Sequence, residues 1–164
     1  MEIRLPEGGA KLYSRLKVSS LDLDLAQYCV GVILKKGWHY QPWEKRGTIY
    51  LQQSAFTSAL VIAYARPFTK SRDWPKFPPA LKEFDSKENA LHDRMIELRN
   101  TLFAHSDSNN YWVSPWRSGE FATDIVGAPA FRINAKDADL LKHMVDKLQD
   151  AIRRRMRQIV PVGA

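Results

Sequence analysis

The sequence predicts an all-α fold, an antiparallel four-helix bundle that occupies residues 1–164 as a single domain. Four segments carry apolar residues that recur every three or four positions, which is the spacing of a helix with one buried face. Each segment is bounded by capping residues, glycine or proline. The connections between most of them are short, which favours antiparallel neighbours. Residues 108–133, between the third and fourth helices, are expected to form an irregular or hairpin insertion.

The first helix is predicted from about Leu21 to Lys36, with Ser19 and Ser20 as capping residues and Gly37 as its end. Residues 1–18 then form an N-terminal arm. The expected buried face consists of apolar residues at spacings of four and three, namely Leu21, Leu25, Tyr28 and Val32.

The second helix follows Gly47 and Thr48, runs to about Arg66 and is stopped by Pro67. Its predicted apolar stripe contains mostly small residues: Leu51, Ala55, Ser58, Ala59 and Ile62. Small side chains in such a stripe indicate the close approach of a neighbouring helix.

The third and fourth helices have the clearest starts. Asp85 is a typical N-cap, and Glu88 three residues later completes a variant of the capping box. The stripe that follows is Leu91, Met95, Leu98 and Leu102. Asn134 caps the fourth helix, which extends to Pro161. Its predicted core face is Leu141, Val145, Leu148, Ile152, Met156 and Ile159.

The insertion is rich in aromatic residues and contains Pro115 and Gly119, which do not suit a helix. Its aromatic and basic residues Trp112, Trp116, Arg117 and Phe121 have two interpretations. They can stack on nucleic-acid bases, or they can close over the bundle as a satellite core, which we favour. Whether the Trp112–Phe131 segment caps a functional site or only the core stays open at this stage.

The charge of the chain bears on its partners. The sequence has 25 basic and 18 acidic residues, a net charge of +7, which favours a polyanion such as RNA. A basic composition without any such role is the alternative. The densest basic cluster is Arg153, Arg154, Arg155 and Arg157, which either contacts phosphates or complements the dipole at a helix C-terminus.

Several classes of site are disfavoured. The single cysteine, Cys29, excludes an intramolecular disulfide and a cysteine-based zinc cluster, and its apolar neighbours indicate a buried thiol. The histidines show no metal-binding spacing, and there is no glycine-rich phosphate loop. We therefore expect no metal and no cofactor. The longest apolar stretch is too short to span a bilayer, and the N-terminus lacks a signal sequence, so a cytoplasmic protein is expected.

Chemically active side chains gather at the end of the third helix, where Arg99, Asn100 and His105 lie within seven residues. On a straight helix Arg99 and His105 would lie about 120° apart and about 9 Å along the axis. They converge only if the helix deforms around Phe103–Ala104 or if two copies of the chain meet. His92 lies on the same side of the helix as Arg99. The alternative is a histidine that favours a helix C-terminus beside a surface arginine.

The segment LRNTLFAHSD resembles the signature of the HEPN superfamily, in which an arginine and a polar residue precede a histidine by a short gap. Here Arg99 is followed by Asn100, and five residues separate it from His105. The helix that ends Tyr64-Ala65-Arg66-Pro67 resembles the abortive-infection branch of that superfamily. The resemblance covers chiefly residues 48–107 and the order of the helices.

The resemblance implies a metal-independent endoribonuclease of a defence or toxin type. His105 would act as general base or acid, Arg99 would stabilise the phosphorane, and Asn100 would orient the histidine or the phosphate. The products would be a 2′,3′-cyclic phosphate and a 5′-hydroxyl. Two chains would pair as a homodimer so that both motifs line one cleft, and a neutralising antitoxin is a further candidate partner.

Additional RNA contacts are expected from His92, Asp107 and the arginines at positions 153, 154, 155 and 157. Asp107 departs from the family pattern, because many HEPN toxins that are controlled by a partner nucleotidyltransferase carry a tyrosine two residues after the histidine. Regulation by tyrosine modification is therefore not expected here. Asp107 either orients His105 or repels a phosphate.

Two other hypotheses belong to different classes. The first is a non-catalytic HEPN-like module that binds nucleic acid, nucleotide or a protein partner. The second is a structural bundle without a site, because every candidate residue also has an acceptable packing or capping role.

Overall fold

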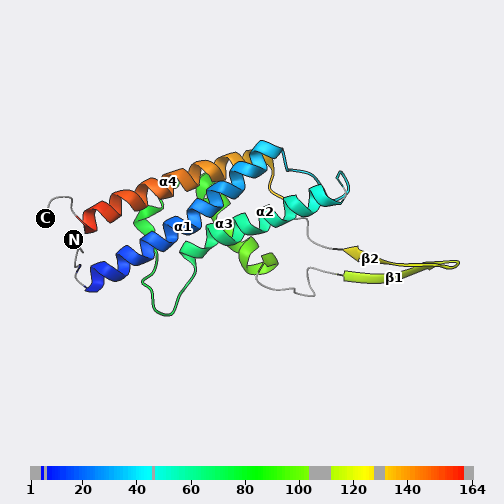
Figure 1. Ribbon diagram of the computed structural model, residues 1–164, viewed down its shortest axis with the longest axis horizontal. Helices are drawn as coiled ribbons and strands as arrows, with labels where there is room; N and C mark the ends of the chain where they lie inside the picture. Colours follow the sequence, from blue (N-terminus) through cyan, green and yellow to red (C-terminus); the bar gives the residue numbers. More distant parts are fainter. Residues whose placement is uncertain (1–4, 6, 46, 104–111, 128–131, 161–164) are drawn as a thin grey trace.

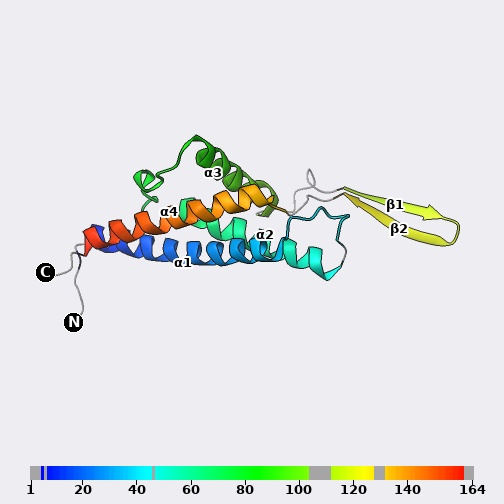
Figure 2. The ribbon, with the colours of Figure 1, turned by 90° about the horizontal axis from the view of Figure 1, so that it is seen from above.

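Three long helices lie side by side in the computed structural model, which describes residues 5, 7–45, 47–103, 112–127 and 132–160. They are α1 (Glu7–Lys36), α2 (Thr48–Ala65) and α4 (Ala135–Ile159). Helix α1 packs against both α2 and α4 and runs antiparallel to each of them (Figure 1). The shorter α3 (Ser86–Leu98) packs against α2 and α4 on the side away from α1 (Figure 2).

Three short helical turns complete the helical part. Pro67 stops α2 as predicted, within the 3₁₀ turn η1 (Arg66–Phe68). A second 3₁₀ turn, η2 (Pro79–Leu81), precedes α3. Helix α3 continues directly into a π-helical turn, η3 (Arg99–Phe103).

The predicted all-α class is wrong, because the insertion between α3 and α4 contains a two-stranded antiparallel sheet. Strands β1 (Trp112–Ser118) and β2 (Phe121–Gly127) pair in register from Trp112 opposite Gly127 to Ser118 opposite Phe121. Gly119 has a φ of 59°, and Glu120 after it has a negative φ. This two-residue loop has the glycine that a type II′ hairpin turn requires at its first central position, which explains why regular strands form.

The hairpin extends beyond the end of the helices (Figures 1 and 2). All seven residues of β1 are exposed, and β2 is exposed up to its last residue. The Trp112 indole lies over Gly127, where an added Cβ would come within 1.8 Å of it. The aromatic residues of the strands therefore pack within the hairpin, and the predicted satellite core over the bundle is wrong for residues 112–127.

One hydrophobic core runs between the helices. Its largest fully buried apolar side chains come from all four helices: Leu16, Leu23, Val30, Ile33, Leu60, Tyr64, Met95, Leu141, Met144, Leu148 and Ile152. Cys29 is buried beside them, as predicted. None of the helices within the described residues has the length and apolar character needed to cross a membrane.

The predicted start of the first helix is wrong. Helix α1 begins at Glu7, so the segment predicted as an N-terminal arm is helical from that residue on. Ser19 is buried inside α1, and the hydroxyl of Ser20 donates a hydrogen bond to the Gln149 side chain of α4 at 2.8 Å. Both serines therefore contribute to interhelical packing instead of capping.

The predicted buried face of α1 is also wrong. Leu21, Leu25 and Tyr28 are exposed, whereas residues two positions away, such as Leu23 and Val30, are buried. The predicted stripe of α2 lies outside the core as well, with Leu51 and Ala55 exposed. Both helices carry apolar residues on two faces, and periodicity does not reveal which face turns inward.

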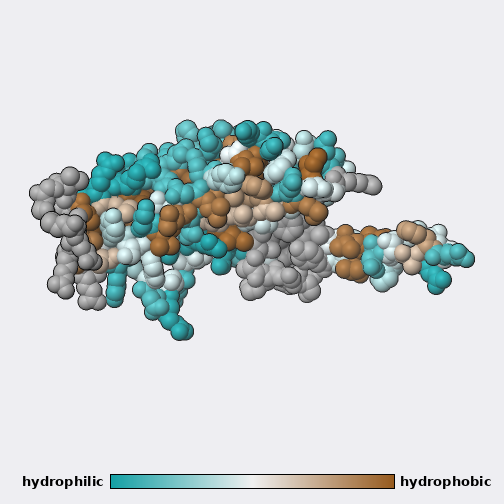
Figure 3. All heavy atoms as spheres, in the orientation of Figure 1, coloured by the Kyte–Doolittle hydropathy of each residue, from teal (hydrophilic) through white to brown (hydrophobic). Residues whose placement is uncertain are grey.

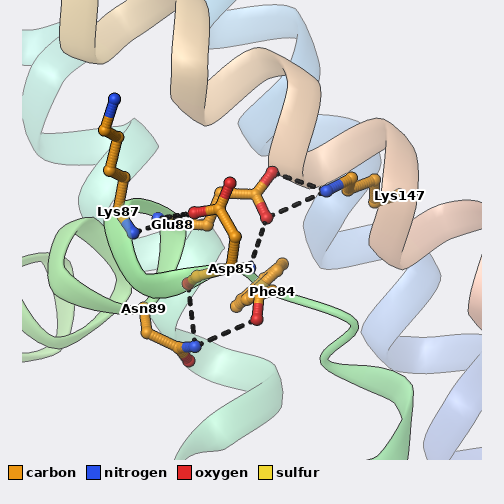
Figure 4. Close-up of polar contacts among 6 residues, drawn as sticks. All are labelled: Phe84, Asp85, Lys87, Glu88, Asn89 and Lys147. Atoms are coloured by element: carbon orange, nitrogen blue, oxygen red, sulfur yellow. Dashed lines mark hydrogen bonds and ion pairs between the residues drawn. The ribbon is translucent and has the colours of Figure 1, made fainter.

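The predicted N-termini of α3 and α4 are confirmed. Asp85 accepts hydrogen bonds from the backbone N–H groups of Lys87 and Glu88, and the Glu88 carboxylate accepts one from the Asp85 N–H (Figure 4). The same carboxylate receives Lys147 of α4 at 2.7 and 2.9 Å, which fixes α3 against α4. Asn134 accepts a hydrogen bond from the Asp137 N–H and caps α4.

Candidate functional site

The hydrogen-bond pattern of the third helix changes at Arg99. The Arg99 N–H reaches the carbonyls of both Met95 and Ile96, and the next turn, through Phe103, is a π-helix. Single π turns that interrupt α-helices are frequently found at functional sites. Residues 99–103 therefore do not follow straight α-helix geometry. His105 and Asp107 lie outside the described residues.

Arg99 and Asn100 form a hydrogen-bonded pair on this turn. The Arg99 Nη1 donates to the Asn100 Oδ1 at 3.1 Å, with Arg99 half-buried and Asn100 exposed. Arg94, one turn earlier, is engaged with the Asp137 carboxylate. Among the residues that the structure describes, no carboxylate forms an ion pair with Arg99. The Arg99 guanidinium thus keeps donors for an incoming anion.

A cavity of about 240 Å³ lies beside the last turn of α3, between α2, α3 and the start of α4. Its walls are mainly apolar and its polar groups converge from three segments. The lining residues are Thr57, Leu60, Val61, Arg94, Met95, Leu98, Arg132, Ile133, Asn134 and Asp137.

Thr57 is the unusual residue in this cavity. Its side chain is 3 % exposed, and its hydroxyl has no hydrogen-bond partner in the structure. A buried hydroxyl without a partner costs stability, so it is usually satisfied. Its oxygen is closed to solvent, so a ligand in the cavity reaches it only when the cavity walls move.

His92 lies inside the core. It is 4 % exposed and is surrounded by the rings of Tyr64, Phe68 and Phe84. Its Nδ1 lies 2.9 Å from the Tyr64 hydroxyl and its Nε2 lies 3.4 Å from the Lys82 ammonium. An ammonium only donates, so Nε2 is the acceptor and Nδ1 carries the proton.

Burial and, to a lesser extent, the Lys82 charge lower the pKa of His92 to about 4. Burial also raises the pKa of the Tyr64 hydroxyl. The pair is therefore neutral near pH 7 and contributes to packing. His92 is thus enclosed by the core in this structure.

The predicted arginine cluster lies on the last turns of α4, at one end of the helical body, whereas η3 follows α3 nearer the middle of the body (Figures 1 and 2). Arg153 pairs with Asp150, Arg154 pairs with Glu83 at 2.7 Å, and Arg155 donates to Gln158. Arg157 is exposed on the last turn of α4. Within one chain the structure does not bring this cluster to the Arg99 segment.

Sequence analysis did not identify Thr57, Arg94 or Arg132 as site residues. The one available signal is that Thr57 interrupts the buried face of α2 with a polar group. Arg94 and Arg132 reach the cavity through tertiary contacts, which no local pattern encodes. Among the described residues, no group of three or more potential ligands is placed to hold a metal.

No family model, curated protein or solved structure matches the chain. The resemblance to the HEPN superfamily therefore remains a prediction from residues 48–107.

Proposed function

We propose that this protein is a metal-independent endoribonuclease of a defence or toxin type, with Arg99, Asn100 and His105 as its site. The observation that supports this proposal most is the π turn at η3. It places the Arg99–Asn100 pair at the point where the third helix departs from α geometry, immediately before the segment that carries His105.

Each residue type suits one step of RNA cleavage. A neutral His105 would take the proton of the ribose 2′-hydroxyl, whose oxygen attacks the adjacent phosphorus. The bond between phosphorus and the 5′-oxygen then breaks, and the leaving oxygen takes a proton from the imidazolium or from water. Arg99 would hydrogen-bond the phosphorane oxygens with its fork of N–H donors. Asn100, which accepts from Arg99, would orient the guanidinium. The products are a 2′,3′-cyclic phosphate and a 5′-hydroxyl.

The cavity next to Leu98 suits a nucleobase beside the scissile phosphate. Its apolar walls can cover the faces of a base, while Thr57, Asn134 and Arg132 offer hydrogen bonds to its edges. Such a combination of apolar walls and a few convergent polar groups is typical of small-ligand sites. When the cavity walls move, the unpaired Thr57 hydroxyl is a group that a base would satisfy.

The main test is cleavage of single-stranded RNA in EDTA by the full chain. Arg99→Ala and His105→Ala should each abolish cleavage without loss of helical circular dichroism. Arg66→Ala is the matched control, because Arg66 is an exposed arginine that pairs with Asp22 away from η3. Full cleavage by both site variants would rule out the assignment. Binding without cleavage, weakened by salt, would indicate the non-catalytic module.

A mixing experiment separates a site within one chain from a composite site of two chains. If two copies share each site, Arg99→Ala mixed with His105→Ala regains part of the activity, because a mixed dimer contains one intact site. If each chain carries its own site, the mixture stays inactive. The resemblance to the HEPN superfamily implies the first result.

A further inference from the structure

The cavity between α2, α3 and the start of α4 has two kinds of wall. Its sides are apolar side chains of α2 and α3, among which Leu60 and Met95 are buried. Its polar wall consists of the segment from Arg132 to Asp137 together with Arg94 of α3. Exposed apolar residues of the helices and the hairpin (Figure 3) offer a ligand only contact area. The cavity adds charged groups to its apolar sides, so it can distinguish one ligand from another.

Asp137 presents one free oxygen at this polar wall. Its Oδ2 receives the Arg94 guanidinium and the Asn134 Nδ2, and its side chain is 20 % exposed. Its Oδ1 receives no hydrogen bond from the residues that the structure describes. Since two neighbours hold the carboxylate in place, Oδ1 is a fixed acceptor for the N–H groups of a ligand.

Arg132 presents donors at the same wall. Its Nη1 donates to the His39 carbonyl oxygen at 3.3 Å. With the Gln41 amide turned so that its oxygen faces Arg132, this oxygen accepts from Nη1 and Nη2 at 3.2 Å each. Both contacts use one edge of the guanidinium. The other edge, formed by Nε–H and the second N–H of Nη2, has no partner within the described part of the chain, and it is a fork of two donors.

We propose that this cavity selects guanine among the four RNA bases. Guanine carries two acceptors, N7 and O6, followed along the same edge by two donors, the N1–H and N2–H₂ groups. The free fork of Arg132 suits N7 and O6, which is the commonest specific contact between a protein and a base. The Asp137 Oδ1 accepts from N1–H and N2–H₂. Arg132 and Asp137 belong to one short segment, so a single base can contact both.

The other three bases match this wall less well. Adenine carries an amino group in place of O6 and an unprotonated N1, so it meets Arg132 with a donor and Asp137 with a lone pair. Cytosine has the same mismatch at N4 and N3. Uracil matches with O4 and N3–H, but it lacks N7 and the amino group. Because polar groups left without a partner lower affinity, the expected order is guanine, then uracil, with adenine and cytosine last.

The guanine site rests on the proposed nuclease function and deepens it, because it names the base beside the scissile phosphate. The cavity volume of about 240 Å³ lies below the roughly 300–1,000 Å³ of pockets for drug-sized ligands, so the cavity suits a single ring system. Leu98 lines the cavity and directly precedes Arg99. A base held here therefore leaves its ribose and phosphate beside the Arg99–Asn100 pair.

Calorimetric titration of the full chain with nucleoside 5′-monophosphates tests this selection without any need for cleavage. The probes GMP, IMP, UMP, AMP and CMP share the same ribose and phosphate, so differences between them report the base. GMP should bind about 10- to 100-fold more tightly than AMP or CMP, which is the discrimination of one bidentate contact. IMP lacks the N2 amino group and should bind between GMP and AMP. The 7-deaza analogue of GMP lacks the N7 acceptor and should also bind more weakly than GMP.

Two variants assign the two halves of the guanine edge to their residues. Asp137→Asn should remove the difference in affinity between GMP and IMP, because the carboxylate that accepts from N2–H₂ is gone. Its matched control is Asp22→Asn, since Asp22 is 18 % exposed and also pairs with an arginine. Arg132→Met should remove the difference between GMP and its 7-deaza analogue, whereas Arg66→Met, the control for loss of an exposed arginine, should preserve it.

Equal binding of all five nucleotides, or binding of none, would overturn the guanine site. So would tighter binding of AMP than of GMP, or a folded Asp137→Asn variant that keeps the full difference between GMP and IMP. If Asp137→Asn does not fold, the comparison of GMP with IMP and the 7-deaza analogue on the natural chain still decides. RNA cleavage without a preference for GMP would overturn the guanine site and leave the nuclease intact, whereas GMP selection without cleavage would do the reverse.

Discussion

Lowering the pH should destabilise the protein through one residue, His92. Its pKa in the folded chain is about 4, against 6.5 for the free side chain. Between these values the unfolded chain binds a proton that the folded chain rejects, so stability falls as the pH falls from 6.5 towards 4. Above pH 6.5 His92 is neutral in both states and adds no pH dependence.

The magnitude follows from the two pKa values. With folded and unfolded pKa values of about 4 and 6.5, lowering the pH from about 7.5 to about 5 reduces the free energy of unfolding by about 2 kcal/mol. Partial hydration of His92 near Lys82 brings the expected reduction to about 1–2 kcal/mol. For a chain of this length the melting temperature should drop by about 2–8 °C. Asp85 does not interfere, because its pKa is lowered from 3.8 by the Glu88 N–H and its contribution is lost only at more acidic pH.

Urea unfolding at the two pH values measures this effect, with His92→Gln as the control. Glutamine keeps polar groups near the Tyr64 hydroxyl but does not titrate in this range. The difference in pH dependence between the natural chain and the variant isolates His92 from the other histidines. An equal loss of stability in both proteins would show that His92 is not the group responsible.

Three further predictions test other parts of the structure. Glu88→Ala removes one end of the capping box and the carboxylate that holds Lys147, so the free energy of unfolding in urea titrations should fall by about 2 kcal/mol. Lys147→Met should lower the free energy of unfolding clearly less, because the lysine is partly exposed. Equal losses of stability in the two variants would contradict this ranking. Thr57→Val removes an unpaired buried hydroxyl and should stabilise the free protein by about 1 kcal/mol. The same variant should bind mononucleotides more weakly in calorimetry. A destabilised variant would mean that the hydroxyl has a partner. Gly127→Ala forces the Trp112 indole off the strand. The NMR resonance of the Trp112 indole N–H should therefore shift, and hydrogen exchange in the hairpin should accelerate. An unchanged NMR spectrum would refute the contact between Trp112 and Gly127.

Local signals account for the parts of the fold that were predicted correctly. The starts of α3 and α4 depend on Asp85, Glu88 and Asn134, which bond backbone groups two or three residues away. The stop at Pro67 is equally local. Such contacts join residues that are close together in the sequence, so they can be predicted from the sequence alone.

The residues of the candidate site come from the sequence motif, whereas their surroundings could not be predicted from the sequence. The Arg99–Asn100 pair follows from the motif, but His92 was assigned to RNA contact although it is enclosed by rings from α2, η1 and the segment before α3. Thr57 and Arg132 escaped notice because the cavity they line exists only where three segments meet. Residues that are distant in the sequence determine both the burial of His92 and the formation of the cavity.

The sequence by itself determined the N-caps of α3 and α4, the heptad-like spacing of apolar residues on α1 and the turn glycine of the insertion, because each depends on backbone groups or side chains a few positions apart. Only the tertiary structure decided which of the two α1 stripes turns inward, that Glu88 meets Lys147, and that the aromatic hairpin stands away from the helices. The physical reason is that both α1 stripes have the same periodicity and similar apolar content. The choice between them depends on which one α2 and α4 can cover together, and that is a property of the packed chain.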